Sequence, residues 1–466
     1  MKRLIFALPL ALSLTATSAL AEAQTQTQAE TQAETKFFDY SGSLGTFTKA
    51  GFNNTKLDEA NGIVPTEGFT SLFGKVDTIY DFKAFIHSDA IKVFKIGLGI
   101  GGNGLVWDTT KNDGQPGVYR NGSGTNRLYI GAWNGNGKVG GKAGGERHYM
   151  LHNAFIDFQS EYFNFQGGRY ESGMDYHSGY TQGFNADLHF KVAPNDELKI
   201  WWFSSWGRAF AESQWFLDFY APKTKDDKNT GIHAGGIDYA HNSLAVDDGM
   251  KRGASVLFRP WAQFYAGIFS AYGGKLDYEQ HFGNGYGVSA TLQGYALSVS
   301  NTAHPTSTEE KADKLSYNLN AILKAYMFDY NLRLGVYKNF GSAGAHIGTY
   351  GNPLGIDQWT GSVYDNGALN DISSRDALSV YLSGGGAHAF EAGTFGWEIL
   401  GRYTKSPRSD EASVALLLSQ SFKNGFVLGL KLEWLNDTTK AGYISENSKT
   451  RTDDRSHAFV TLDYNF

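Results

Sequence analysis

The chain has 466 residues, of which 57 are glycine, 15% are aromatic and none is cysteine, and its formal net charge is −6. Without disulfides, backbone pairing and packing must supply the stability of an exported chain. The acidic balance argues against nucleic acid as a partner, which would require a basic surface. A hydrophobic fraction of 41% does not exclude a membrane barrel, because strands with one apolar and one polar face average to such a value.

The N-terminus predicts export. Lys2 and Arg3 precede a short apolar stretch, and small residues at Ala19 and Ala21 mark a secretory signal over residues 1–21. Residues 22–36 form a low-complexity run rich in Ala, Gln, Thr and Glu, which predicts a disordered leader. No later segment reaches the roughly 20 continuous apolar residues of a membrane-spanning helix. We expect the folded part of the chain to begin at residue 37.

From residue 37 onward the chain repeats one design of alternating strand, short turn, alternating strand and longer polar loop. Apolar side chains occupy every second position from Phe184 to Val192, a turn follows at 193–196, and the alternation resumes from Leu198 to Trp202. Further hairpins are expected at 72–82 with 94–100, 154–158 with 163–165, 256–258 with 264–271 across Pro260, 276–282 with 288–296, 315–323 with 330–336, 378–382 with 397–403, and 414–422 with 426–434.

Together with one strand near 38–48 and a final strand, these hairpins make about 18 strands. The fold class is therefore an all-β transmembrane antiparallel barrel, expected as a single outer-membrane domain over residues 37–466, with both chain ends and all short turns on the periplasmic side and long loops outside. Keeping this alternation requires that 232–239, which is faintly strand-like, belong to a long loop from about 207 to 252.

The last ten residues, HAFVTLDYNF, alternate apolar and polar side chains and stop on an aromatic residue. We expect this strand to close the barrel against the first one, because only a closed sheet leaves no unpaired edge in a bilayer. Tyr464 and Phe466 resemble the assembly signal that the outer-membrane insertion machinery reads. The alternative is an ordinary edge strand that ends in Phe by chance.

Two segments carry a resemblance to a known family. AFIDFQSEYFNFQGGRYESG (154–173) looks like the strand, turn and Gly-Arg element of porins, and TYGNPLGIDQWTGSVYDNG (349–367) resembles a loop of the Hof-type outer-membrane proteins of the Helicobacter lineage. Those proteins are similar in design to OprD-type porins, monomeric barrels of 18 strands. The resemblance implies a monomer in outer-membrane lipid and lipopolysaccharide. It also implies passive diffusion of small hydrophilic solutes, including solutes that bear a carboxylate, through a charged and loop-constricted pore.

If so, inward-facing charges set selectivity. The pore-lining candidates are the basic Arg169, Lys199, Arg333, Arg402 and Lys431 and the acidic Asp157, Asp187, Glu398 and Glu433. The alternative for each is that opposite charges simply neutralise one another. Arg169 shares parity with the apolar Phe163 and Phe165 and would face lipid, so either it lies near the outer rim or a bulge at Gly167–Gly168 turns it inward; we expect the bulge, because paired glycines tolerate it.

Three external connections could narrow the pore. The first is 171–182, with Asp175, Tyr176 and His177; the second is 207–252, with Arg208; the third is 339–376. The sequence does not single out one of them.

Signals for catalysis or cofactors are weak, and we expect neither. His148 and His152 flank a strand start, the acidic pairs 226–227, 247–248 and 453–454 lie in expected loops, and the glycine-rich 135–145 has no following helix. Adhesion is the alternative function, in which long loops bearing Trp107, Trp133 and Trp359 bind host or matrix molecules around a barrel that serves only as an anchor.

Overall fold

The computed structural model describes residues 36–466 except 57, 59–62, 111–129, 132–147, 222, 225, 227, 248, 301–312, 345–346, 348–354, 358–359, 363–369 and 444–448. The expected signal peptide and nearly all of the leader lie outside the described residues. So do the glycine-rich stretch, Trp133, Trp359 and most of the 349–367 segment.

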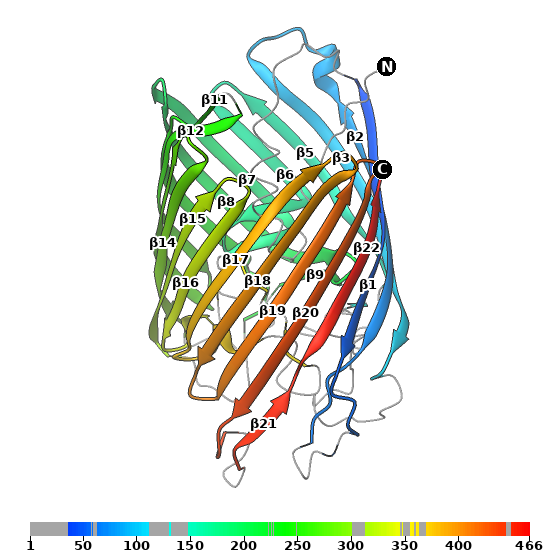
Figure 1. Ribbon diagram of the computed structural model, residues 1–466. Coiled ribbons are helices and arrows are strands. Elements are labelled where there is room, and N and C mark those ends of the chain that lie inside the picture. Colours follow the sequence, from blue (N-terminus) through cyan, green and yellow to red (C-terminus); the bar gives the residue numbers. More distant parts are fainter. Residues whose placement is uncertain are drawn as a thin grey trace.

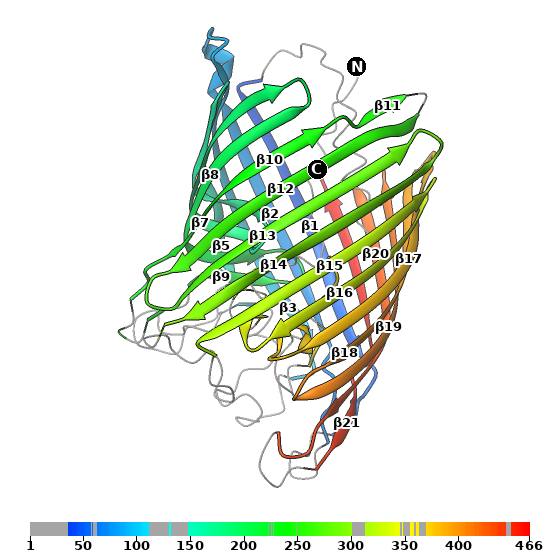
Figure 2. The same cartoon turned by 90° about the vertical axis from the view of Figure 1, so that its left-hand side faces the viewer.

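Tilted antiparallel strands form a closed barrel of 18 wall strands (Figures 1 and 2). The wall strands are β1 (Phe38–Gly51), β2 (Phe69–Asp81), β3 (Ile91–Asp108), β5 (Tyr149–Ser160), β6 (Phe163–Met174), β7 (His177–Ala193), β8 (Asp196–Ala211), β10 (Ile232–Asn242), β12 (Met250–Tyr265), β13 (Phe269–Phe282), β14 (Tyr286–Val299), β15 (Leu315–Met327), β16 (Tyr330–Phe340), β17 (Leu378–Phe390), β18 (Gly393–Lys405), β19 (Ser409–Phe422), β20 (Phe426–Thr439) and β22 (His457–Asn465). Short strands β4 (Ile130–Gly131), β9 (Phe216–Tyr220), β11 (Ala245–Asp247) and β21 (Arg451–Asp454) and the 3-10 turns η3 (Phe82–Phe85) and η5 (Asp371–Ser373) lie in the connections. The predicted fold class is confirmed.

The last strand closes the barrel, as the sequence predicts. β22 pairs with β1 from Ser43 opposite Asn465 to Gly51 opposite His457. Past the ladder, Gly42 N–H donates to the Phe466 carbonyl at 2.9 Å and Phe466 N–H donates to the Gly42 carbonyl at 3.0 Å. The Phe466 ring lies over Gly42, where a Cβ would collide with it. A residue without a side chain therefore makes room for the terminal aromatic ring at the seam.

Both described chain ends lie at the same end of the barrel (Figure 1). The connections at that end are short: 82–90, 161–162, 194–195, 243–249, 283–285, 328–329, 391–392 and 423–425. The opposite end carries the long connections 52–68, 109–148, 212–231, 300–314, 341–377 and 440–456. It also carries the short turns 175–176, 266–268 and 406–408, so the expectation of long loops throughout that end is wrong.

Two strand assignments are wrong, and their errors cancel in the count. Residues 232–242 are the wall strand β10, paired with β8 and β12, rather than part of a loop. Its glycines are covered by its neighbour, since a Cβ on Gly235 or Gly236 would meet the Trp202 or Trp201 ring at 2.9 or 2.7 Å. The tryptophans of β8 thus supply the apolar surface over β10. For this reason the sequence of β10 itself alternates only weakly between apolar and polar residues.

The second error concerns Pro260, which lies inside β12 opposite Gly274 rather than in a turn. Because proline has no N–H, the β10–β12 ladder is interrupted beside it. The strand continues to Tyr265, and the turn comes at 266–268.

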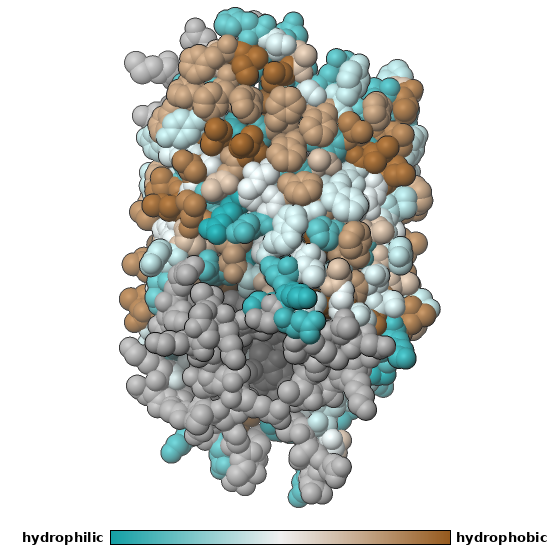
Figure 3. Space-filling view, turned by 180° about the vertical axis from the view of Figure 1, so that it is seen from behind, coloured by the Kyte–Doolittle hydropathy of each residue, from teal (hydrophilic) through white to brown (hydrophobic). Residues whose placement is uncertain are grey.

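The barrel is apolar outside and polar inside. On β15, Leu319 and Leu323 are 45% and 57% exposed, whereas Asn318 and Asn320 on either side of Leu319 are buried. Seen from behind, apolar side chains cover much of the upper wall (Figure 3). This reversal of the usual pattern is typical of a sheet whose outer face contacts lipid. Within the described residues, no helix has the length and apolar character needed to span a bilayer.

Candidate functional site

The β6–β7 hairpin leaves the wall and enters the lumen. β6 pairs with β5 only from Asn164 to Arg169, while its pairing with β7 continues to Met174. At the tip, the Asp175 carboxylate reaches the inner face of β12 and β13, which follow β8 and β10 along the wall. Its Oδ2 lies 3.0 Å from Arg259 Nη1 on β12, and its Oδ1 lies 3.1 Å from Lys275 Nζ on β13.

The rest of the hairpin tip is fixed by aromatic packing and hydrogen bonds. The Tyr176 ring packs on Trp261 and Tyr295, with centroids 5.3 and 5.4 Å apart. His177 Nε2 lies 2.9 Å from Ser205 Oγ. Arg208 Nε donates to the Ser178 carbonyl at 2.7 Å. The four predicted constriction residues, Asp175, Tyr176, His177 and Arg208, therefore all belong to this hairpin or hold it.

The connection from β8 to β10 also folds inward, against a different part of the wall. β9 pairs with the end of β8 and with β4. Its Phe216 packs on Phe73 of β2, with centroids 6.3 Å apart, and joins a buried apolar cluster that includes Phe47, Phe69 and Phe459. Asn103 of β3 donates to the Glu212 carbonyl at 3.0 Å. This connection thus fills the lumen beside β1–β3.

The third connection, 341–377, is attached to the wall by basic side chains. Three wall cations bind its described part: Lys49 Nζ donates to the Gly361 carbonyl at 2.8 Å, Arg333 Nη1 donates to the Gly355 carbonyl at 2.9 Å, and Lys431 Nζ lies 2.8 Å from Asp357 Oδ2. Beyond them, Arg408 Nη1 lies 3.1 Å from Asp371 Oδ1. The described parts of all three candidate connections therefore fold into the lumen, a result that the sequence leaves open.

The pore-lining candidates separate into an accessible and a buried set. Asp157, Asp187 and Lys199, on β5, β7 and β8, are partly exposed to the lumen. Asp187 Oδ1 lies 3.1 Å from His189 Nδ1, and Lys199 Nζ lies 3.4 Å from Asp238 Oδ2.

The buried set pairs acid with base. It consists of Arg333 with Glu398, Arg402 with Glu411 at 2.6 Å, and Lys431 with Glu433 at 2.6 Å. Each of these side chains is at most 7% exposed. For this set, the geometry matches the alternative of mutual neutralisation better than a row of free cations.

The orientation of Arg169 does not result from a register shift in β6. The pairings of β6 with β5 and β7 run through Arg169 without a break, so the expected bulge at Gly167–Gly168 is wrong. Gly168 instead has φ +118°, and the register shift lies across the hairpin, between Thr181 and Gly183. The Arg169 guanidinium stacks 4.5 Å over Phe219 of β9, which packs on the buried luminal cluster. Arg169 therefore faces the inward-folded connection.

Several functional candidates were missed by the sequence reasoning. Arg259 and Lys275, which bind the hairpin tip, share the inward face of their strands with Trp261 and Asp277. If the sequence analysis had continued the strand through Pro260, the alternation would have placed Arg259 and Lys275 on the inward face. Lys49 and Glu67, a buried ion pair of 2.6 Å, lack any such signal because their contact depends on how the 52–68 connection folds.

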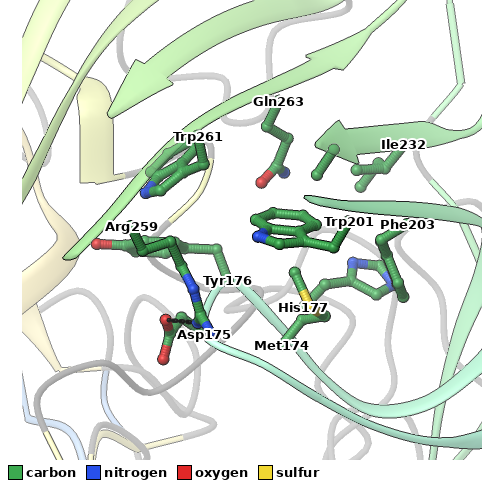
Figure 4. A pocket seen from close by; sticks show the side chains of 11 residues that line it. Met174, Asp175, Tyr176, His177, Trp201, Phe203, Ile232, Arg259, Trp261 and Gln263 are labelled. Atoms are coloured by element: carbon green, nitrogen blue, oxygen red, sulfur yellow. Dashed lines mark hydrogen bonds and ion pairs between the residues drawn. The ribbon is translucent and has the colours of Figure 1, made fainter. Parts of the chain in front are cut away.

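A small pocket lies beneath the hairpin tip, between Tyr176, Trp201 and Trp261 (Figure 4). Its volume of about 20 Å³ suffices for roughly one water molecule. Gln263 points into it, and its buried Nε2 has no hydrogen-bond partner among the described residues. Arg259 at its edge is held by both oxygens of Asp238, at 2.8 and 2.7 Å.

In the described part of the chain, no group of three or more His, Asp or Glu side chains could hold a metal ion. His148 and His152 take different partners, the Asn103 carbonyl at 2.9 Å and Asp77 at 2.8 Å.

An apolar outer face, a closed sheet and a charged, partly filled lumen define an integral outer-membrane β-barrel. Residues 24–466 match the family HP_OMP_2, described as "Putative outer membrane protein", and the chain belongs to this family. The resemblance to outer-membrane proteins of the Helicobacter lineage is thereby confirmed. The protein is integral to the bacterial outer membrane.

Solved porin structures share the fold at low sequence identity. OccAB3 of Acinetobacter baumannii superimposes with a TM-score of 0.58 at 7% identity, covering 92% of this chain and 99% of that one. OccK2 (OpdF) of Pseudomonas aeruginosa gives 0.56 at 10% identity, covering 93% and 99%. A BenF-like porin of Pseudomonas fluorescens gives 0.53 at 12% identity, covering 93% and 100%. A search of curated protein sequences gives no significant match.

Proposed function

We propose that this barrel is a porin that lets small hydrophilic solutes, including carboxylates, diffuse passively through a charged pore narrowed by three inward-folded connections. The observation that carries the proposal is the contrast between the two sides of the lumen. Charges on β5, β7, β8, β12 and β13 are partly exposed, whereas the pairs of Arg333, Arg402 and Lys431 on β16, β18 and β20 are buried. The solute path therefore follows the β5–β13 side.

The pairing of charges along this path supports a role in selecting solutes. Lys199, Arg259 and Lys275 alternate with Asp238, Asp175 and Asp277 within hydrogen-bond or ion-pair distance. A solute with separated charges can exchange partners along such a row at little desolvation cost. The proposal includes no catalytic step, and a monomer in lipid and lipopolysaccharide is its working assembly.

The terminal strand is assigned a role in assembly. Tyr464 packs against Phe426 and Phe466, with centroids 4.8 and 6.0 Å apart, on the strand that closes the barrel against β1. We assign these aromatics to recognition by the barrel-insertion machinery.

The proposal is tested by liposome swelling. Vesicles carrying the refolded protein should swell in isotonic solutions of small sugars, amino acids and monocarboxylates, at rates that fall steeply with solute size because the connections narrow the pore. Vesicles with heat-denatured protein provide the control. A folded barrel that admits none of these solutes would contradict the porin function. That result would favour adhesion through the external connections; Trp107, which lies at the outer end of the wall strand β3 rather than in a loop, is 47% exposed.

A further inference from the structure

The Asp175 carboxylate occupies a site on the inner wall that has the chemistry of an anion-binding site. Its two oxygens separately contact a guanidinium and an ammonium group, Arg259 at 3.0 Å and Lys275 at 3.1 Å. Arginine and lysine side by side are the usual partners of a carboxylate or other small anion. Asp175, however, comes from the two-residue tip of the inward-folded hairpin, not from the wall.

The wall alone carries excess positive charge at this point. Its cations are Lys199, Arg259 and Lys275, and its carboxylates in contact with them are Asp238 and Asp277. Asp238 already accepts hydrogen bonds from Arg259 and from Trp201 Nε1, the second at 2.7 Å. Asp175 thus supplies the third negative charge that makes the cluster neutral.

The cluster is open to water in the lumen. The side chains of Asp175, Arg259 and Lys275 are 26%, 20% and 18% exposed. A permeating ion can therefore approach the two cations, and their field is not confined within the protein.

We propose that Arg259 and Lys275 form an anion-binding station of the pore that Asp175 occupies as an internal counter-ion, so that Asp175 determines the charge selectivity of the channel. The inference rests on the proposed porin function. A passing carboxylate or chloride competes with Asp175 for the same two cations. Without the Asp175 charge, the station attracts anions.

The test is the reversal potential of single channels in a potassium chloride gradient for the wild type and for Asp175→Asn. Asparagine has the same size and keeps one acceptor oxygen for the hairpin contacts, so the variant should fold, as its heat-modifiable mobility on a gel will show. The potassium-to-chloride permeability ratio should fall roughly two- to fivefold, the range that a partly exposed charge pair carries. In the double variant Asp175→Asn/Lys275→Gln, the cluster is again neutral. The potassium-to-chloride permeability ratio should therefore move back toward the wild-type value.

Asp313→Asn is the matched control. Asp313 is also 26% exposed and pairs with an arginine, Arg375, at 2.7 Å, but it lies away from the cluster, on the connection before β15. The control should leave the permeability ratio unchanged. If Asp175→Asn conducts with the wild-type ratio, or if Asp313→Asn shifts it equally, the assignment of Asp175 is overturned. If neither the folded wild type nor any variant conducts, the porin function itself fails, and this inference fails with it.

Discussion

At the residue scale, the lumen holds acids in places where a soluble protein would put apolar side chains. Glu212 follows β8 on the inward-folded connection, close to Glu171 of β6. Burial, and then the Glu171 charge, raise the pKa of Glu212 to about 8 from an ordinary value of 4.5. The folded protein therefore holds a proton at Glu212 that the unfolded chain releases above about pH 4.5.

This raised pKa makes stability depend on pH in a defined direction. A raised pKa of an acid stabilises the folded state fully below pH 4.5, and this contribution is lost as the pH rises to about 8. We expect the melting temperature of the wild-type barrel, measured as the temperature at which the band of the folded protein is lost from a gel, to fall between pH 5 and pH 8.5. In Glu212→Gln the melting temperature should fall less over this pH range, by a few degrees. A change of about 1 kcal/mol in the free energy of unfolding shifts the melting temperature of a large domain by ~2–4 °C.

Glu161→Gln is the control for this experiment, because Glu161 is exposed in the 161–162 turn. It should keep the wild-type pH profile. An unchanged profile in Glu212→Gln as well would show that the proton on Glu212 does not stabilise the connection.

At the element scale, wall cations act as anchors for the 341–377 connection. Lys431 lies between Glu433 of its own strand, at 2.6 Å, and Asp357 of the connection, at 2.8 Å. Breaking a buried pair by removing one partner costs about 3–5 kcal/mol, because it leaves the other charge poorly compensated. On the proposed porin function, we expect the basic residues on this side to stabilise the constriction rather than to bind solutes.

Asp357→Asn should loosen the 341–377 connection. We expect a larger and noisier open-channel current, because the connection then occupies the lumen for less of the time. Asp376→Asn is the control on the same connection: Asp376 is 47% exposed and pairs with Arg375 at 3.5 Å, an interaction worth little. Its φ of +52° is also one that asparagine tolerates. Equal currents in Asp357→Asn and the wild type would contradict the role of Lys431 as an anchor.

At the scale of the whole molecule, the lumen is asymmetric. The connections fill the side of β1–β3 and the side of β16–β22, and partly exposed charges remain along β5–β13. An 18-strand barrel with an empty lumen would have a wide, open pore. Here the three inward-folded connections leave a path that should conduct much less, with a selectivity determined by few side chains.

Much of this architecture could be predicted from the sequence, because lipid imposes a strict period of two on each wall strand. The closing strand and the inward parity of Lys199 and Arg333 follow from that period, whereas the strand number agrees only because the two wrong assignments, at β10 and at Pro260, cancel. β10 could not be recognised, since Trp201 and Trp202 of β8 cover its glycines. The pairing of Asp175 with Arg259 and Lys275 was also out of reach, because it joins a hairpin tip to strands 84 and 100 residues further along the chain. Local periodicity carries no information about such contacts.

The measurement that tests the account most directly is the single-channel conductance of the purified, refolded wild-type protein in a planar lipid bilayer. We expect discrete current steps that are smaller than those of an open barrel of this strand number. Their reversal potential in a salt gradient should be modest, because opposite charges are balanced along the open side of the lumen. A folded, heat-modifiable barrel that never conducts would contradict the account.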